Sequence, residues 1–537
     1  MGQWRNSRPG KLLGAAALGA MLASAAFDGH AQTAERVTVV MDPSAAETNR
    51  AWATGGAFDL DAVFQRLIGN DSETGVYDNS ALVESWETND DFTVWTFHLK
   101  PDAEWHNGWG KVTSADVAHS YEIQTGPDTL ATGIQALRGA EVEIVDDHTI
   151  RFVFDEPSMD FDFANAGRGS MYIYSKAQFD AQGMEGYDRE PAGTGHFRFV
   201  EREPGRVLLE TVENHWSGTT PDFGELELRF TLEPATKLAM LLSGEADIAV
   251  VPRELLGDAA GAGMEIVTSR QPSKHVVIMP DGLYMKEGDP AFNPELPWTD
   301  VRVREAMNRA LNRDEIIDVI YGGEAEKLAV YGMHEAHEGF VPELVERFEA
   351  EYGYDPERAR ALLDEAGYPD AFGQPVIPIV STVSPGSPEY PSLAELIQVY
   401  FEEAGFQTEI REMDWASLGA LGRGRESYVI HPVQNAPIRP SHVALTNTFL
   451  EEGSTYHGYE DDELTALVEE MIRTIDPGKR EALIREAFTY AFENYTDMPM
   501  VSLSHPVAVN PETIETWIYP GVTSNGLSHW HLIKPAS

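Results

Sequence analysis

The sequence of 537 residues contains no cysteine. This absence excludes disulfide bonds, thiolate metal sites and cysteine nucleophiles, and it also excludes a lipid anchor on a cysteine after a signal sequence. Basic residues are few, with 39 Lys and Arg against 88 Asp and Glu, so the formal net charge is −49. A field of this sign repels nucleic acids and anionic membrane surfaces, and we expect neither as a partner.

Long hydrophobic runs are absent after the N-terminus. The first residues carry Arg5, Arg8 and Lys11, then an apolar run over 12–27, then small residues ending at Ala31, which is the layout of a secretory signal peptide. An uncleaved anchor is the alternative, but the run is short for a bilayer span. We predict that residues 1–31 are a cleaved signal peptide and that the mature protein is free in the periplasm of a double-membraned bacterium.

Catalytic signatures are missing as well. The sequence contains no GxSxG nucleophile elbow, no GxxxxGK[ST] phosphate loop and no complete GxGxxG fingerprint. The HEAHE motif at 334–338 spaces its histidines i, i+3, so we interpret it as a solvated turn rather than a zinc site. The acidic run YEDDE at 459–463 precedes a predicted helix, where acids cap well, and it lacks the glycine of a calcium loop. We therefore predict no enzyme activity, no metal and no cofactor.

The segment from Ala81 to Tyr121 predicts two strands, a turn and the start of a helix. Residues 92–99 alternate aromatic and β-branched side chains, His106-Asn107-Gly108 supplies a turn, and Thr113 or Ser114 can cap a helix. Strands are also predicted at 36–41 and at both sides of a turn at 146–148, and residues 192–229 are rich in strands. A helix is predicted at 60–68 because its apolar residues fall on one face.

After residue 234 helices and strands alternate. The predicted helices are 236–243, 301–311, 314–321, 356–366, 393–404, 462–475 and 479–494, and the strands are 248–251, 377–380 and 408–412. Alternation of this kind predicts a mainly parallel sheet with helices on its faces. A chain of this length exceeds one hydrophobic core, so we expect two α/β lobes with a smaller β-rich insertion.

Several phrases in the sequence resemble one family. The stretch ALVESWETNDDFTVWTFHLKPDAEWHNGWGKVTSADVAHSY at 81–121 is followed by GTGHF at 193–197, LLSGEADI at 241–248, DVRVREAMN at 300–308 and YDPE at 354–357. In this order they resemble the family 5 extracytoplasmic solute-binding proteins, the oligopeptide, dipeptide and nickel receptors of ABC importers. The match departs mainly at Trp109-Gly110-Lys111.

The resemblance implies a two-lobed periplasmic binding protein fold of type II with an additional smaller β-rich domain. It implies domain I from 32–69, 190–278 and 501–537, domain II over 70–189, and domain III over 279–500. Segments 273–279 and 500–504 are then the hinge candidates. It also implies a monomer that hands an unchanged solute to an ABC permease and its ATPase in the inner membrane.

The ligand contacts are predicted from the pocket that the resemblance implies. In peptide receptors of the family an Asp in a segment matching 423–449 pairs with the peptide amine, but this chain has no Asp between 414 and 461. The charge of residues 415–450 is +2, so an Arg in this segment could instead bind a carboxylate or phosphate. The alternative is that these arginines lie on an outer loop and bind no ligand. Trp52 is added as a candidate because its ring could stack on a ligand. The candidate ligand-binding residues are Trp52, His275, Arg423, His431, Gln434, Asn435 and Arg439.

Several functions stay open at this point. The ligand is expected to be a peptide-like or other small polar solute, with an acidic or polyhydroxylated compound favoured over a plain peptide. Nickel or haem cargo, carried by relatives, would use scattered histidines such as His275, His431 and His442. A periplasmic hydrolase or esterase on the same scaffold is the alternative from another class, and a chemoreceptor role would share the same lobes.

Overall fold

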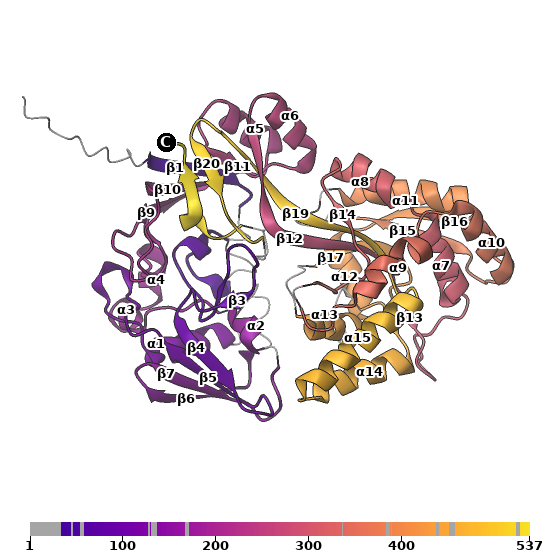
Figure 1. The fold of residues 1–537 in the computed structure, drawn as a ribbon, viewed down its shortest axis with the longest axis horizontal. Coiled ribbons are helices and arrows are strands. Elements are labelled where there is room, and N and C mark those ends of the chain that lie inside the picture. The colour runs from indigo at the N-terminus through magenta and orange to yellow at the C-terminus, as the bar shows by residue number, and fades with distance from the viewer. Residues whose placement is uncertain are drawn as a thin grey trace, which may run out of the picture.

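The computed structural model describes residues 34–43, 47–53, 58–126, 129, 137–159, 161–166, 171–335, 337–382, 387, 389–435, 440–450, 457–521 and 527–537. Two lobes are joined by two long strands, β12 (Glu265–Pro280) and β19 (Met498–Val509) (Figure 1). The first lobe holds the chain before β12 and after β19, and the second lobe holds the chain between them. The predicted two-lobed α/β fold with a smaller β-rich part is confirmed.

The predicted signal peptide lies outside the described residues. Within the described part of the chain, no helix combines the length and apolarity that a membrane crossing requires.

One sheet of eleven strands runs through both lobes, in the order β16-β15-β17-β12-β19-β11-β1-β10-β9-β8 with β14 also paired to β19. β12 and β19 are antiparallel, from Glu265 beside Val509 in the first lobe to Ile278 beside Met498 in the second. Their register shifts between Thr268 and Lys274, so the ladder is irregular midway between the lobes. Both predicted hinge segments fall within these two strands.

The prediction of a mainly parallel sheet after residue 234 is wrong, because the sheet is mixed. β15 is parallel to β16 and β17, and β11 is parallel to β1. β12 and β19 run in opposite directions between the lobes, and each pairs antiparallel with a neighbour, β17 and β11 respectively. The two connecting strands therefore insert an antiparallel centre that helix and strand alternation does not predict.

The first lobe places its sheet around a core that includes Val39, Leu209, Trp517 and Trp530. Its elements outside β12 and β19 are β1 (Ala34–Met41), β2 (Gly69–Asn70), β3 (Tyr77–Asp78), β8 (Phe197–Glu203), β9 (Arg206–Thr211), β10 (Phe223–Phe230), α5 (Pro234–Leu242), β11 (Ile248–Ala249), α6 (Leu256–Gly261), β20 (Ile514–Trp517) and β21 (Ile533–Pro535). Short 3-10 turns lie at Ala51–Ala53, Phe58–Ala62, Arg253–Leu255 and Trp530–Leu532. Residues from both chain ends complete this core.

The smaller β-rich part is a four-stranded sheet of order β4-β5-β7-β6 with its own core. Thr113 caps α1 through a reciprocal pair with Asp116, as the sequence predicts. Its elements are β4 (Val83–Thr88), β5 (Val94–Leu99), a 3-10 turn at His106–Gly108, α1 (Ser114–Thr125), β6 (Glu141–Asp146), β7 (Thr149–Val153), α2 (Phe161–Ala166), α3 (Lys176–Gln182) and α4 (Met184–Arg189).

The predicted helix at 60–68 is wrong beyond its first turn. Leu60, Val63 and Phe64 are buried as expected, but only a 3-10 turn forms at Phe58–Ala62. The carbonyl of Val63 accepts from Gly195 N–H, and that of Gln65 accepts from Ile173 N–H. Because these backbone groups bond to distant segments, they are not available for helical hydrogen bonds.

The second lobe packs helices on both sides of its part of the sheet around the largest core. Its caps follow the sequence: Asp355 caps α10, which has Pro356 in its first turn and ends at Gly367 with φ +78°. Its elements are β13 (Leu283–Tyr284), a 3-10 turn at Pro297–Thr299, α7 (Val301–Ala310), α8 (Arg313–Tyr321), β14 (Glu326–Lys327), α9 (Pro342–Tyr352), α10 (Pro356–Ala366), β15 (Val376–Ser381), α11 (Tyr390–Ala404), β16 (Gln407–Glu412), α12 (Trp415–Arg423), β17 (Ile430–Asn435), α13 (Ser441–Phe449), β18 (Tyr459–Glu460), α14 (Asp462–Arg473) and α15 (Pro477–Glu493).

Candidate functional site

The carboxyl ends of the parallel strands β15, β16 and β17 lie at one edge of the second lobe. At the end of β17, Asn435 pairs with His275 of β12, and His275 pairs on its other side with Ser502 of β19. This edge therefore lies where both connecting strands enter the second lobe. Crevices beyond the carboxyl ends of parallel strands are the usual ligand sites of α/β sheets, so we take this edge as the candidate site.

A cavity of about 520 Å³ opens at the same edge. It is lined by Ser381 and Thr382 after β15, by Glu412 and Met413 after β16, and by Pro391 and Asp414. Asp414 caps α12 through Ser417, whose N–H lies 2.9 Å from its carboxylate. Thr382 is buried, and its hydroxyl has no hydrogen-bond partner among the described residues. The residues that line the cavity thus include one buried hydroxyl that can still donate a hydrogen bond.

Two predicted site residues lie together at the end of β17. His275 is 2% exposed and Asn435 is 3% exposed, and they face one another across β12 and β17. Burial, with the nearby His334 and His337, lowers the pKa of His275 to about 3, so its ring is neutral at pH 7. Its Nδ1 atom and the Oδ1 atom of Asn435 have no hydrogen-bond partner within the described part of the chain. Both can therefore bond to a ligand or to water.

Gln434 points to the opposite face of β17 from Asn435. Its Oε1 atom accepts from the hydroxyl of Ser387 at 2.5 Å, so it connects β17 to the segment between β15 and α11. His431, two residues before Val433, binds Asp281 through Nε2 at 3.1 Å. Asp281 also accepts from Ser427. The structure thus brings His275, Gln434 and Asn435 to the edge, and engages His431 inside the lobe.

The arginines of residues 415–450, the segment with a charge of +2, do not lie together in the structure. Arg423 is exposed at the last residue of α12. Arg425 instead forms ion pairs with Asp289 at 2.5 Å and with buried Glu460, and its guanidinium lies 4.3 Å from the ring centre of Tyr284. Its charge is therefore compensated within the lobe. Arg439 lies outside the described residues.

Trp52 lies in the first lobe, in the 3-10 turn at Ala51–Ala53. Its ring packs edge-on against Tyr174, with 4.8 Å between ring centres, and against Tyr187 at 6.3 Å. The side chain is 8% exposed. The structure therefore includes this ring in the core of the first lobe.

The two motifs weighed for metal binding serve other contacts. In the 334–338 motif, Glu338 binds His442 and Arg480 and is half-buried rather than solvated. Asp461 caps α14 through Leu464 N–H, which confirms the cap interpretation, whereas Glu460 is buried among His457, Arg425 and Lys286. Among the residues that the structure describes, no group of three or more His, Asp or Glu side chains is arranged to hold a metal ion.

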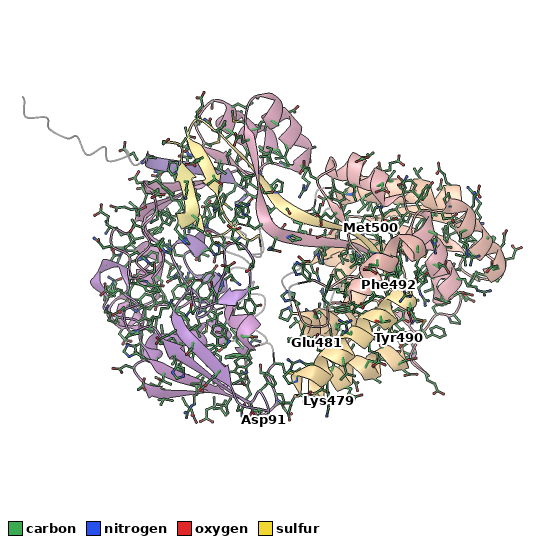
Figure 2. The ribbon with its side chains drawn as sticks, in the orientation of Figure 1. Asp91, Lys479, Glu481, Tyr490, Phe492 and Met500 are labelled. Carbon is green, nitrogen blue, oxygen red and sulfur yellow. The ribbon has the colours of Figure 1, made fainter. Side chains whose placement is uncertain are left out.

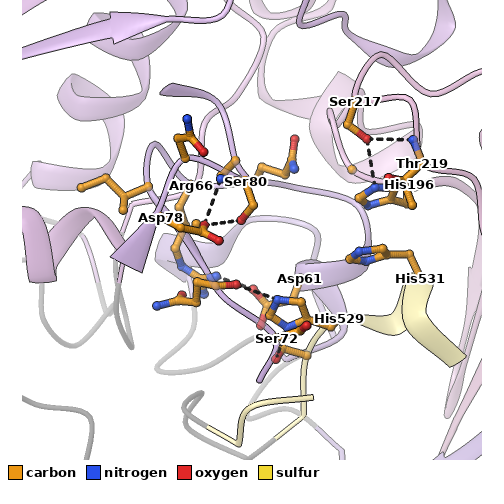
Figure 3. A pocket seen from close by; sticks show the side chains of 18 of the residues that line it. Asp61, Arg66, Ser72, Asp78, Ser80, His196, Ser217, Thr219, His529 and His531 are labelled. Carbon is orange, nitrogen blue, oxygen red and sulfur yellow. Dashed lines mark hydrogen bonds and ion pairs between the residues drawn. The ribbon is translucent and has the colours of Figure 1, made fainter. Parts of the chain in front are cut away.

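A larger cavity, of about 850 Å³, lies wholly in the first lobe (Figure 3). None of its lining residues comes from between β12 and β19. Figure 3 shows His196 and His531 facing one another on one side, with 3.8 Å between nearly parallel rings. Burial lowers the pKa of His531 to about 3, with repulsion from His529 adding to the shift. The first-lobe cavity thus combines neutral imidazoles with carboxylates such as Asp61 and Asp78.

Sequence reasoning missed Thr382 and the histidines of the first-lobe cavity. Thr382 could have been found from its position two residues after the strand predicted at 377–380. His196, His529 and His531 come from segments more than 300 residues apart, and nothing in their spacing indicates that they meet.

The family follows from comparison with known proteins. Residues 79–451 match the model described as "Bacterial extracellular solute-binding proteins, family 5 Middle". The chain belongs to this family. The predictions of a solute-binding protein rather than an enzyme, and of a position outside the cytoplasm, are confirmed.

Individual relatives are distant. The chain is 28% identical to heme-binding protein A of Haemophilus influenzae over 66% of its length and 65% of that protein, slightly less than two thirds of the relative. It is 25% identical to the dipeptide-binding protein of Escherichia coli over 80% of its length and 81% of that protein. The solved structure of HbpA2 from Haemophilus parasuis superposes with a TM-score of 0.76 at 22% identity, covering 94% of this chain and 100% of that one, which confirms the predicted binding-protein fold.

Proposed function

We propose that this protein captures a peptide-like or other small polar solute between its lobes and delivers it unchanged to an ABC permease with its ATPase. The predicted domains I, II and III and a monomeric, freely periplasmic form are part of this proposal. Closure around the solute excludes water and strengthens each polar contact. The solute supplies the differential affinity that populates the closed form.

The observation that supports the binding site most directly is a set of buried polar atoms at the second-lobe edge. His275 Nδ1, Asn435 Oδ1 and Thr382 Oγ1 have no hydrogen-bond partner among the described residues. An unpaired buried polar group costs about 1–3 kcal/mol. A solute that hydrogen-bonds to these atoms removes that cost, and its binding is favoured accordingly.

The charge of the segment supports a proposal about the solute. No Asp lies between 414 and 461 to pair with a peptide amine, and Arg423 and Arg439 are cations in a chain of net charge −49. We propose a solute with an acidic or polyhydroxylated group. The two relatives named above are called heme- and dipeptide-binding, so membership of the family leaves the ligand class to experiment.

A thermal-shift screen tests the solute class. Acidic and sugar-containing solutes are expected to raise the melting temperature in proportion to the logarithm of their concentration. Stabilisation by unmodified di- and oligopeptides alone would overturn the proposed class. Mass spectrometry of the solute that copurifies with natively expressed protein identifies the compound whose binding is measured in the later experiments.

A matched pair of substitutions tests the site. Thr382→Val removes the unpaired hydroxyl and is expected to weaken solute binding about tenfold, as measured by calorimetry. Thr408→Val, at the amino end of neighbouring β16, removes a hydroxyl bonded to Glu402 and should leave affinity unchanged. Equal affinities of the two variants would exclude this edge as the site.

Location and delivery are tested separately. The proposal expects the protein in a periplasmic fraction, with an N-terminus that begins after Ala31. It also expects solute-loaded protein to stimulate ATP hydrolysis by the neighbouring permease complex more than empty protein does.

A further inference from the structure

The lobes touch at a second place, at the end of the molecule opposite β12 and β19. Figure 2 shows Asp91 of the first lobe close to Lys479 and Glu481 of the second lobe at this end. The contact is made by Arg480, near the start of α15, whose side chain is 11% exposed. This contact joins residues more than 300 positions apart in the chain.

Arg480 contacts residues of both lobes. Its Nη1 atom donates to the sulfur of Met159 at 3.5 Å, and its guanidinium lies 5.4 Å from the ring centre of Phe92, both in the first lobe. In its own lobe, Nε and Nη2 donate to Glu338 Oε2 at 3.4 and 3.3 Å. A guanidinium over an aromatic face contributes about 0.5–2 kcal/mol, more as the pair is desolvated.

The first-lobe side of the contact is held by its own backbone. Phe92 lies in the turn between β4 and β5 with φ +56°, a conformation that a non-glycine residue rarely adopts. Its N–H donates to Asn89 and its carbonyl accepts from Ser158, next to Met159. The ring also packs against Trp95, with 6.2 Å between ring centres. The turn therefore presents Phe92 and Met159 to the other lobe in a fixed arrangement.

Glu338 connects the contact to the proposed binding segment. Its Oε1 atom lies 2.9 Å from Nδ1 of His442, the second residue of α13. α13 begins two residues after Arg439, and β17 with Asn435 comes directly before that stretch. One carboxylate is thus shared by the inter-lobe contact and by the helix that follows the segment proposed to bind the solute.

We propose that Arg480, Glu338, Phe92 and Met159 form a closure latch that sets how readily the lobes stay shut. This inference rests on the proposed function, which it deepens by naming a residue set that regulates the same site from outside it. The latch favours the closed form by a fixed amount, and the measured affinity for solute includes that amount. Substitutions in the latch are expected to change affinity although none of its residues needs to touch the solute.

The experiment measures the lobe distance without ligand. Because the chain has no cysteine, Glu143→Cys on β6 and Glu470→Cys on α14 provide one spin label on each lobe. In this background Arg480→Gln is expected to move the distance distribution to longer values. Arg485→Gln is the control, because Arg485 lies on the same helix but contacts Phe340 and Glu343 of its own lobe.

A double-mutant cycle tests the pairing. Phe92→Ser removes the first-lobe ring, and the double variant Phe92→Ser with Arg480→Gln is expected to open no further than either single variant. Circular dichroism and melting temperature exclude variants that fail to fold. With the copurified solute, Arg480→Gln is expected to weaken affinity about fivefold while Arg485→Gln leaves it unchanged.

The outcomes separate this inference from the proposed function. If Arg480→Gln and Arg485→Gln give the same lobe distances, the latch is overturned whatever the solute. If the latch variants open the protein but no small solute binds to the unmodified chain, the latch is supported and the proposed function fails. Additive opening by the two single substitutions would show that Phe92 and Arg480 act separately, which also overturns the latch.

Discussion

The two places where the lobes meet differ in kind. At one end, β12 and β19 carry the backbone across and pair with each other over most of their length. At the other end, a single guanidinium contacts a thioether and an aromatic ring. The first junction is made by the backbone of two paired strands, and the second consists of side-chain contacts alone. We therefore expect the strands to determine where the lobes rotate, and the proposed latch to contribute only to how long they stay together.

Substitutions at the strand junction should therefore lower the free energy of unfolding more than substitutions at the latch. Arg313 lies beside it, 3% exposed, and donates to the carbonyl of Pro499 on β19 at 2.6 Å and to that of Tyr352 at 3.0 Å. Arg313→Ala leaves these buried carbonyls unpaired and should lower the free energy of unfolding by about 4–5 kcal/mol, as measured by urea titration. Arg302→Ala, an exposed control, should change it by less than about 0.5 kcal/mol. Equal effects would contradict the comparison.

A pH experiment examines the same junction with a smaller effect. Burial raises the pKa of Asp497, directly before β19, from 3.8 to about 7. The folded state then keeps a proton that the unfolded state loses near pH 4, so this group lowers stability as the pH rises from about 4 to 7. Asp497→Asn should remove that loss and raise the free energy of unfolding by about 2–4 kcal/mol at pH 8, with little change at pH 4. Parallel pH profiles for the two proteins would contradict this assignment.

The smallest effect is expected at the latch. Although burial opposes it, hydrogen bonding from His442 and the charges of His442 and Arg480 lower the pKa of Glu338. A lowered pKa of this kind stabilises the fold above about pH 4.5, and the contribution is lost as the pH falls through the lower value. Glu338→Gln should cost less than about 1 kcal/mol at pH 7, because the side chain is partly exposed, and nothing at pH 2. A loss as large as that of Arg313→Ala would show that the latch is a structural core element.

Much of the fold could be predicted because local patterns determine it. The cap at Thr113, the turn at 146–148 and the helices α7, α8, α10, α11, α14 and α15 follow from side-chain spacing and end residues. The helices α9, α12 and α13 were not predicted. The helix predicted at 60–68 does not form, because carbonyls of this segment bond to Gly195 and Ile173, which are far away in the sequence. The prediction of a mainly parallel sheet failed for the same reason, because the antiparallel centre pairs strands that are far apart in the sequence.

The site was predictable in part. His275 and Asn435 were predicted with the help of a family resemblance, and the structure pairs them across β12 and β17. As ligand contacts they stay predictions. The latch was missed, since it depends on which distant segment lies opposite, and Thr382 was missed although it follows a predicted strand closely. Periodicity identifies faces of elements, but it does not identify their partners.

The order of the chain has a consequence for how the protein is made. Val507, Val509, Trp517 and Trp530 belong to the core of the first lobe, together with Val37 and Val39 from the other end of the described chain. A ribosome or an export channel that has released only the first 490 residues has therefore released neither a finished first lobe nor the strand that closes the second. Completion of the first-lobe core must therefore await the last forty residues, whereas the core of the small β-rich part needs none of them.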